Sequence, residues 1–256
     1  MNRWLTSFLF LGALAFLLGQ ADPSAAQKGN GKKKVQIKVP TKSPVILPGK
    51  GTSETINLFN GKDLDGWEGY KNLWSVKEGI IVARNEKPLP FSTYLLTKRK
   101  FSDFRLVFSA KLVESEMHSG IALWGRRITP KQAKNPVKQF AEYTYQGQLV
   151  MFPSGWGLYD LYRRHGGINP SPKIRGVAMK AGKQHDWNDM EILAKGDRIR
   201  LVVNGQLVLD WRDPEPNCID EGPIGLQLHS NNIPQEIHFK GLVLTTFPDD
   251  KLMTVK

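Results

Sequence analysis

The chain has 256 residues, 40% of them hydrophobic, and a formal net charge of +12. This length suffices for one domain that buries most of its apolar surface. The single cysteine, Cys218, excludes an internal disulfide, and a lone thiol without a neighbouring motif is predicted to be inert.

The first 26 residues have the pattern of a secretory signal. Arg3 precedes an apolar run of 15 residues from Trp4 to Leu18, and small residues follow as far as Ala21 and Ala26. A membrane-spanning helix needs roughly 20 apolar residues, whereas the apolar part of a signal peptide has about 7–15. We expect cleavage after Ala21 or Ala26 and export to the periplasm or the cell exterior. An uncleaved anchor is the alternative.

Residues 27–53 form a basic segment with seven lysines, no acidic residue, three prolines and four glycines. Such a composition cannot bury enough apolar surface to offset chain entropy, so we expect a mostly disordered linker. Arg3 and Asp22 cancel, so these lysines account for +7 of the +12 and leave +5 for the rest. The linker could contact a polyanion or the cell envelope weakly, but a solvated spacer is favoured and no nucleic-acid partner is expected.

Residues 54–247 are built of short alternating segments separated by turns, and residues 248–256 form a C-terminal tail. The segment FRLVFSAKLVE alternates apolar and polar residues, which is typical of a half-buried strand. Asn204-Gly205 lies between two alternating runs, and this pair is a strong hairpin signal. Many short strands without a sustained helical period predict an all-β jelly-roll sandwich.

The segment HSGIALWGRR, residues 118–127, is predicted to be a strand with two different faces. Side chains alternate between the faces of a strand, so His118, Trp124 and Arg126 should share one face and aliphatic residues the other. An aromatic ring and a planar cation on a small-residue surface are suited to a sugar ring and its hydroxyls. Trp124 and Arg126 are therefore candidate substrate-binding residues.

A second polar row is expected in the segment AEYTYQGQ. Glu142, Thr144 and Gln146 would share one face of a strand, with tyrosines on the other. A row of this kind is either an ordinary solvent-exposed face or a binding face. Its expected proximity to Trp124 and Arg126 makes Glu142 and Gln146 candidate site residues.

The segment GWGLYDLYRR offers two further candidates. Trp156 lies between two glycines at a strand start, where it could stack on a ligand or cap the core. Arg163 and Arg164 cannot both point inward, and Arg164 is the one we assign to substrate binding, as an arginine can bind an oxyanion bidentately. A surface ion pair is the alternative for this arginine.

Gln227 and His229 should share a face of the strand GLQLH, with leucines opposite, and Gln227 is a candidate substrate-binding residue. Histidine is the side chain best suited to proton transfer near neutral pH, so His118 and His229 are candidate catalytic residues. A structural hydrogen-bonding role is the alternative for both. The spacing of Cys, His and acidic residues suggests no metal site, and no cofactor is expected.

Several segments together identify a family. They are INLFNGKDLDGW, NLWSVKEGIIVA, YLLTKRKFSDFRLVFSAKL, HSGIALWG, HDWNDMEILAKGDRIRLVVNGQLVLDW and EGPIGLQLHSNNIPQEIHFKGLVL. In this order they resemble the 3-keto-disaccharide hydrolase domain family, over residues 54–247. The resemblance implies a sandwich similar to the concanavalin A-like lectins and glucanases.

The resemblance also implies a reaction on disaccharides oxidised at C3. A base removes the C2 proton, which the keto group acidifies; the C1 leaving group departs and water then adds. Family members often have Asn-Ser-Gly where this chain has His118-Ser119-Gly120, and a Tyr-Glu-x-Gln strand where this chain has altered spacing around Thr144.

Two hypotheses follow for the exported protein. In the first it is a carbohydrate hydrolase in which Glu142, His118 or His229 takes the proton and the other candidates hold the sugar. In the second it is a non-catalytic glycan-binding module at the cell envelope. A third possibility is a cell-surface interaction domain whose ligand is a protein. The sequence leaves the sugar, its linkage and the oligomeric state open.

Overall fold

The computed structural model describes residues 49–114, 118–128, 141–152, 156–168, 177, 180–215 and 221–256. The chain divides into two units, Met1–Pro40 and Thr41–Lys256, and every described residue belongs to the second. The predicted signal, most of the predicted linker and Cys218 lie outside the described residues. Within those residues, no helix has the length and apolarity needed to cross a membrane.

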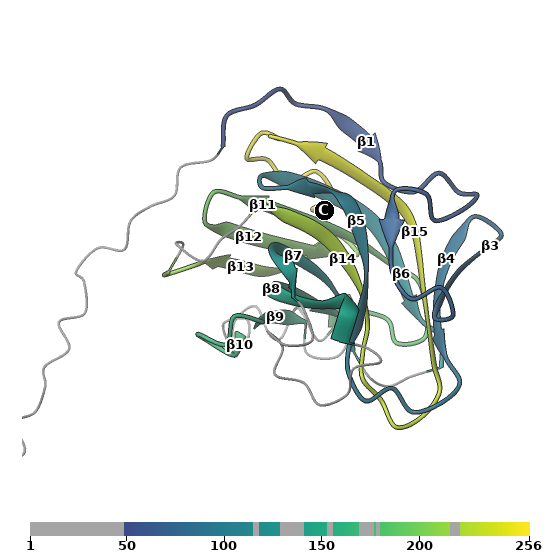
Figure 1. Cartoon of the computed structure of the whole chain (residues 1–256). Coiled ribbons are helices and arrows are strands. Elements are labelled where there is room, and N and C mark those ends of the chain that lie inside the picture. Colours follow the sequence, from purple (N-terminus) through teal and green to yellow (C-terminus); the bar gives the residue numbers. More distant parts are fainter. Residues whose placement is uncertain are drawn as a thin grey trace, which may run out of the picture. The chain divides into compact units, whose positions relative to one another are not determined.

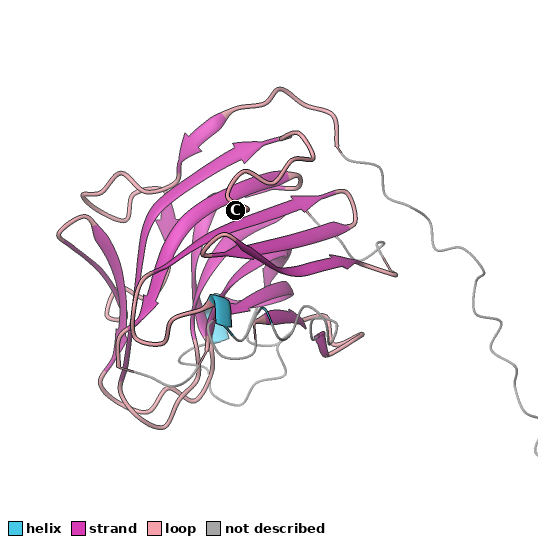
Figure 2. Ribbon diagram, turned by 180° about the vertical axis from the view of Figure 1, so that it is seen from behind, coloured by secondary structure: helices cyan, strands magenta, loops and turns pink. Residues whose placement is uncertain are grey.

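Two antiparallel sheets form the domain (Figures 1 and 2). The eight-stranded sheet runs in the order β13 (Gln206–Arg212), β12 (Arg198–Val203), β11 (Asn188–Lys195), β6 (Phe104–Leu112), β15 (Gln235–Thr246), β4 (Ile80–Asn85) and β3 (Trp74–Lys77), with β1 (Thr55–Asn57) also paired to β15. The seven-stranded sheet runs in the order β10 (Gly167–Ile168), β9 (Gly157–Asp160), β8 (Thr144–Phe152), β7 (Ser119–Ile128), β14 (Gly222–Leu228), β5 (Thr93–Phe101) and β2 (Trp67–Glu68). The predicted all-β sandwich is confirmed.

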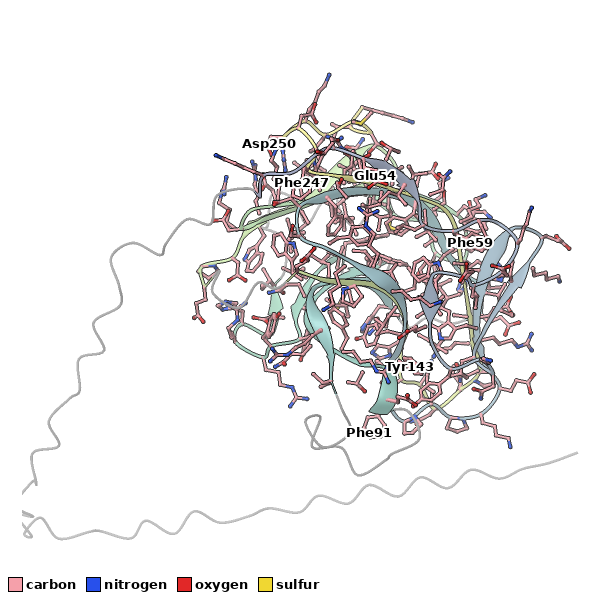
Figure 3. All side chains as sticks on the ribbon, turned by 45° about the horizontal axis from the view of Figure 1, so that its top comes forward. Glu54, Phe59, Phe91, Tyr143, Phe247 and Asp250 are labelled. Carbon is pink, nitrogen blue, oxygen red and sulfur yellow. The ribbon has the colours of Figure 1, made fainter. Side chains whose placement is uncertain are left out.

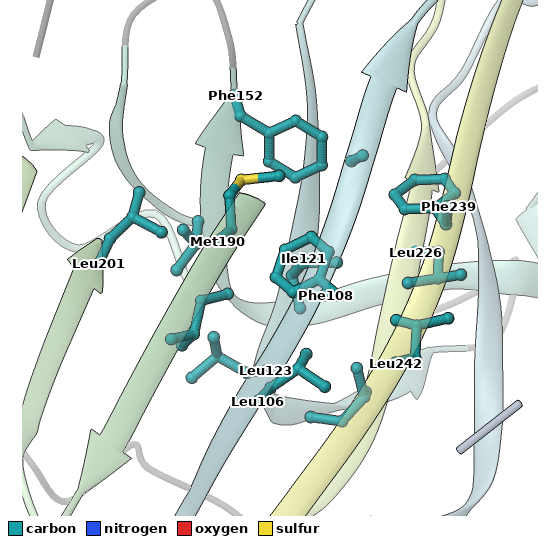
Figure 4. Packing of buried hydrophobic residues seen from close by; sticks show 14 of the residues in the cluster. Leu106, Phe108, Ile121, Leu123, Phe152, Met190, Leu201, Leu226, Phe239 and Leu242 are labelled. Carbon is teal, nitrogen blue, oxygen red and sulfur yellow. The ribbon is translucent and has the colours of Figure 1, made fainter. Parts of the chain in front are cut away.

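Alternate side chains of both sheets meet in one core (Figure 4). Phe108 of β6 packs against Phe152 of β8, with ring centroids 6.1 Å apart, and Phe152 packs against Phe239 of β15 at 6.2 Å. Each such side chain contributes roughly 1.5–3 kcal/mol when fully buried. On each long strand, the side chains of one face therefore lie in the core, and those of the opposite face lie on the outer side of the sheet.

The predicted hairpin at Asn204-Gly205 joins β12 to β13. Both residues have positive φ, 48° for Asn204 and 86° for Gly205. A two-residue turn with positive φ at both positions matches the right-handed twist of the flanking strands, and Asn-Gly adopts it at little cost. This turn is confirmed.

The predicted linker and tail both contact the domain. Thr246 Oγ1 donates a hydrogen bond to the carbonyl of Thr52 at 3.2 Å, and Gly51 lies against the ring of Phe247. Phe247 and Asp250 lie near Glu54 at the top of Figure 3. Residues 49–53, which we expected to belong to the linker, therefore contact the last residue of β15 and Phe247, which follows it.

The C-terminal tail is held by a carboxylate on the outer face of the eight-stranded sheet. Glu191 of β11 is fully buried and accepts hydrogen bonds from the backbone N–H groups of Met253 (2.9 Å) and Thr254 (2.8 Å). Arg105 of β6 donates to the same carboxylate at 3.0 Å and is itself buried. One buried ion pair thus joins two strands to the end of the chain.

Glu191→Ala should destabilise the domain strongly. The substitution removes the buried partner of Arg105, which then keeps only the exposed carboxylate of Asp249 at 2.6 Å, and breaking a buried pair costs about 3–5 kcal/mol. Denaturant unfolding monitored by tryptophan fluorescence measures the loss. Glu54→Ala is the matched control, because Glu54 pairs with Arg99 where both side chains are 54% exposed. Equal losses in the two variants would contradict the role given to Glu191.

Candidate active site

The outer face of the seven-stranded sheet carries the candidate site. Alternation along β5, β7 and β8 points Leu95, Ile121 and Val150 into the core, so their neighbours Tyr94, Ala122 and Leu149 point outward. The outward side chains form a second, smaller apolar cluster, whose buried members are Tyr94, Leu96, Ala122, Tyr145 and Leu149. This outer cluster is the platform beside which the polar candidates lie.

His118 and His229 meet at one end of this face. His118 immediately precedes β7 and His229 immediately follows β14, and these two strands are antiparallel neighbours. Their rings are 4.1 Å apart at an angle of 62°, an edge-to-face contact. Ser119 Oγ donates to the carbonyl of Gln227 at 2.7 Å and fixes the start of β7 against the end of β14. Two of the three predicted catalytic residues are therefore brought together.

The hydrogen bonds of His229 define its tautomer. Its Nδ1 is 2.5 Å from the backbone oxygen of Ser230, and a carbonyl can only accept, so Nδ1 carries the proton. In the neutral ring, Nε2 then has a free lone pair. Gln235 donates from Nε2 to the carbonyl of His229 and holds the backbone of this residue in place.

Burial keeps both imidazoles neutral. Desolvation, with a smaller contribution from the charge of His229, lowers the pKa of His118 to about 4. Desolvation also lowers the pKa of His229, although the Ser230 carbonyl opposes this shift. Near neutral pH the pair is therefore uncharged.

Gln227 lies on the outer face between the imidazoles and the tyrosines. Its Nε2 donates to the hydroxyl of Tyr94 at 3.4 Å, and burial raises the pKa of Tyr94, so the phenol stays protonated. Among the described residues, the buried Oε1 atom of Gln227 has no hydrogen-bond partner. The amide is thus fixed on one side and has an unused acceptor.

The predicted position of Glu142 is wrong. It lies in a short 3₁₀ helix, η1 (Ala141–Tyr143), and β8 begins only at Thr144, so Glu142 does not share a strand face with Gln146. Its side chain is 55% exposed and pairs with Arg127, whose Nη2 is 2.8 Å from Oε1. Arg127 also donates to the Glu142 carbonyl at 2.6 Å and lies over the ring of Tyr143.

Trp124 does not share a face with His118, because a β-bulge interrupts β7. The pairing of β7 with β8 shifts between Leu123 and Arg126, and Trp124 has a φ of 51°. The bulge turns Trp124 into the core, where it is 1% exposed and donates from Nε1 to the carbonyl of Ser102. This burial does not suit the stacking role expected of Trp124.

Arg126 and Gln146 lie opposite each other across β7 and β8, with Nη2 3.4 Å from Oε1. Gln146 and Gln148 are two positions apart on β8, so their side chains point to the same face. Gln148 is fully buried on the core side. The two candidates are therefore partners, as their positions in the sequence suggested. Their face is not the one that carries the imidazoles.

Trp156 and Arg164 are also placed away from the imidazole pair. Trp156 is 4% exposed and packs so closely on Gly182 that a Cβ atom there would lie 1.9 Å from the ring. Arg164 pairs with the buried carboxylates of Asp213 (2.8 Å) and Asp160 (3.3 Å). Trp156 thus caps the core, and Arg164 connects the end of β9 to the segment after β13.

Some features of the site were not expected from the sequence. Tyr94 and Tyr145 pack at a ring distance of 5.9 Å on the outer face, and Arg127 rather than Arg126 contacts η1. The alternation of apolar and polar residues predicted which side chains point outward, but it did not predict which strands are neighbours in the sheet. In the described part of the chain, no group of three or more His, Cys, Asp and Glu is arranged to hold a metal ion.

Comparisons with known proteins agree with this architecture. A Parabacteroides distasonis ATCC 8503 protein assigned as a glycosyl hydrolase has a TM-score of 0.52 and 17% identity, covering 76% of this chain and 94% of its own. Bacillus licheniformis beta-glucanase has a TM-score of 0.50 and 12% identity, covering 78% of this chain and 100% of its own. These likenesses confirm the concanavalin A-like jelly-roll fold. No curated protein matches the sequence.

The family is shown by the sequence as a whole. The family model for the 3-keto-alpha-glucoside-1,2-lyase-like domain matches residues 54–245, which include every strand except the last residue of β15. The match spans most of the chain and coincides with the segments that carried the resemblance. This chain belongs to the family of the 3-keto-alpha-glucoside-1,2-lyase-like domain.

Proposed function

We propose that this protein cleaves the glycosidic bond of a 3-keto-disaccharide, with His229 as the base. Family membership supports a carbohydrate substrate, and the neutral imidazole pair supports proton abstraction. The observation that carries the proposal is the bond between His229 Nδ1 and the Ser230 carbonyl. It leaves Nε2 of a neutral ring as an acceptor, which a general base requires.

The proposed reaction proceeds in two stages. His229 Nε2 takes the proton from C2 of the oxidised sugar, and the electrons of the C–H bond form an enolate whose charge lies on the C3 oxygen. The bond between C1 and the glycosidic oxygen then breaks, and the leaving oxygen takes the proton from the imidazolium. Water adds across the new double bond, so the products are a 3-keto sugar and the released alcohol.

The surrounding side chains have supporting roles in this proposal. Gln227 Oε1 accepts a hydrogen bond from a sugar hydroxyl, while Tyr94 holds the other end of the amide. His118 packs edge-to-face on His229 and fixes the ring plane. Glu142 is a weaker candidate for the base, because its carboxylate is exposed and already paired with Arg127.

Export stays a proposal alongside this activity. The apolar run from Trp4 to Leu18 and the small residues after it support a cleaved signal. Mass spectrometry of the protein recovered from the producing cell would reveal a mature chain that begins after Ala21 or Ala26. A full-length chain in the cytoplasm would contradict export.

His229→Asn should lower turnover of a 3-keto-disaccharide about a hundredfold or more, since general-base catalysis typically contributes 10²–10⁴-fold. The assay follows release of the reducing sugar. His238→Asn is the matched control, because His238 lies on β15 of the other sheet and pairs with Glu236. Unchanged turnover in His229→Asn would remove this residue from the role of base. Sugar binding by the native protein without any product release would instead support the glycan-binding module.

The half-buried imidazole of His118 also makes stability depend on pH. The pKa of His118 is about 4 in the folded protein against its usual 6.5, so the unfolded chain binds this proton more readily. The contribution of neutral His118 to stability is complete above about pH 6.5 and is lost as the pH falls towards 4. The melting temperature of the native protein minus that of His118→Asn should therefore decrease between pH 7 and pH 4. Carboxylates titrate in both proteins and cancel in the difference, so a constant difference would contradict the burial of His118.

A further inference from the structure

A separate cleft of about 640 Å³ lies on the eight-stranded sheet, between the start of β3 and the segment that follows β4. Figure 1 shows β3 and β4 at the side of the domain away from β10. The described lining runs over two segments, residues 71–75 and 84–90. The imidazole pair does not line this cleft, so the two features are distinct.

The cleft is built on fixed backbone. Leu73, Trp74 and Leu89 are buried and form its apolar part, and Pro88 and Pro90 are exposed beside them. The Leu73 carbonyl accepts a hydrogen bond from the Arg84 N–H at 2.9 Å, and Leu89 exchanges two backbone bonds with Asn231. A binding surface held in this way loses little conformational entropy when a ligand arrives.

The polar lining is predominantly cationic. The lining contains three cationic residues, Lys71, Arg84 and Lys87, and one acidic residue, Glu86. Arg84 pairs with Glu236 at 3.2 Å but remains 53% exposed, and in the described part of the chain Lys71 and Lys87 have no ion pair. Lys71, Arg84 and Lys87 against Glu86 and Glu236 leave a net charge of +1, so the lining keeps a positive excess.

Two buried polar atoms of the lining residues lack partners. Asn85 is 3% exposed; its Nδ2 donates to the carbonyls of Lys87 (2.8 Å) and Ile233 (3.2 Å), while its Oδ1 has no partner among the described residues. The indole Nε1 of Trp74, also 3% exposed, is likewise without a described partner. Buried polar atoms in native proteins are rarely unsatisfied, so each one calls for an explanation.

We propose that this cleft binds an acidic oligosaccharide, that is, a sugar chain carrying carboxylate or sulfate groups. The exposed rings of Pro88 and Pro90 suit the C–H face of a sugar ring, and the lysines suit its acidic groups. A hydroxyl that reaches the floor, directly or through one ordered water, supplies the donor that Asn85 Oδ1 lacks. The inference does not depend on the proposed catalytic function, because none of the lining residues belongs to the imidazole site.

The test compares three probes on the full chain: trigalacturonate, a heparin-derived tetrasaccharide and neutral maltotriose. Binding is measured by calorimetry, and the indole N–H signal of Trp74, identified by its loss in Trp74→Phe, reports occupation of the cleft. We expect one of the acidic probes to bind and to shift this signal, and maltotriose to bind at least tenfold more weakly. The acidic probe that binds tells whether carboxylates or sulfates are recognised.

The double variant Lys71→Gln/Lys87→Gln should weaken that binding at least tenfold, which corresponds to about 1.4 kcal/mol. Its matched control is Lys62→Gln/Lys77→Gln, which removes the same charge from exposed positions outside the cleft. Equal losses in both variants, or binding that leaves the Trp74 signal unmoved, would show nonspecific attraction to the basic chain and overturn the proposal. Maltotriose binding as tight as that of both acidic probes would overturn it as well. Hydrolysis of 3-keto-disaccharides should be unaffected by Lys71→Gln/Lys87→Gln, so the two proposals can fail separately.

Discussion

The structure depends on the burial of one face of each sheet against the other. Because side chains alternate along a strand, the residues that fill the core also determine which residues remain outside. Ile121 and Val150 are fully buried, and this fixes Ala122 and Leu149 on the outer face of the seven-stranded sheet. The candidate site is therefore a consequence of the core. A shift of one residue in any central strand would replace its platform with core residues.

The imidazole pair owes its properties to strand neighbours that are far apart in the chain. His118 and His229 are 111 residues apart, yet the antiparallel pairing of Ile121 with Leu226 brings the start of β7 beside the end of β14. The same packing removes water from both rings and lowers the pKa of each. One arrangement thus supplies both the proximity and the neutrality of the two imidazoles, on which the proposed proton abstraction depends.

The two outer faces of the sandwich are used differently. On the seven-stranded sheet the outer face is aromatic and carries the imidazoles at one end. On the eight-stranded sheet a buried carboxylate, Glu191, ties down the C-terminal tail, and a cationic cleft lies at the β3 and β4 edge. The lysines of the cleft, Lys71 and Lys87, lie beside exposed prolines and two buried polar atoms without described partners.

The sequence by itself determined the fold class, the family and the local turns. The Asn204-Gly205 hairpin follows from two residues that tolerate positive φ, and the alternation of β14 correctly placed Gln227 and His229 on one face. These features depend on neighbouring residues alone, so they can be read along the chain.

Tertiary structure decided which candidates meet. The bulge in β7 turned Trp124 into the core, because strand pairing beyond Leu123 could continue only with a shift of register against β8. Glu142 does not lie on the expected strand, because Arg127 on the neighbouring strand holds it in a 3₁₀ turn. Arg164 is likewise held by Asp213, which is 49 residues away in the chain. Bulges, cross-strand partners and buried ion pairs depend on contacts between distant segments, and a pattern of period two contains no information about them.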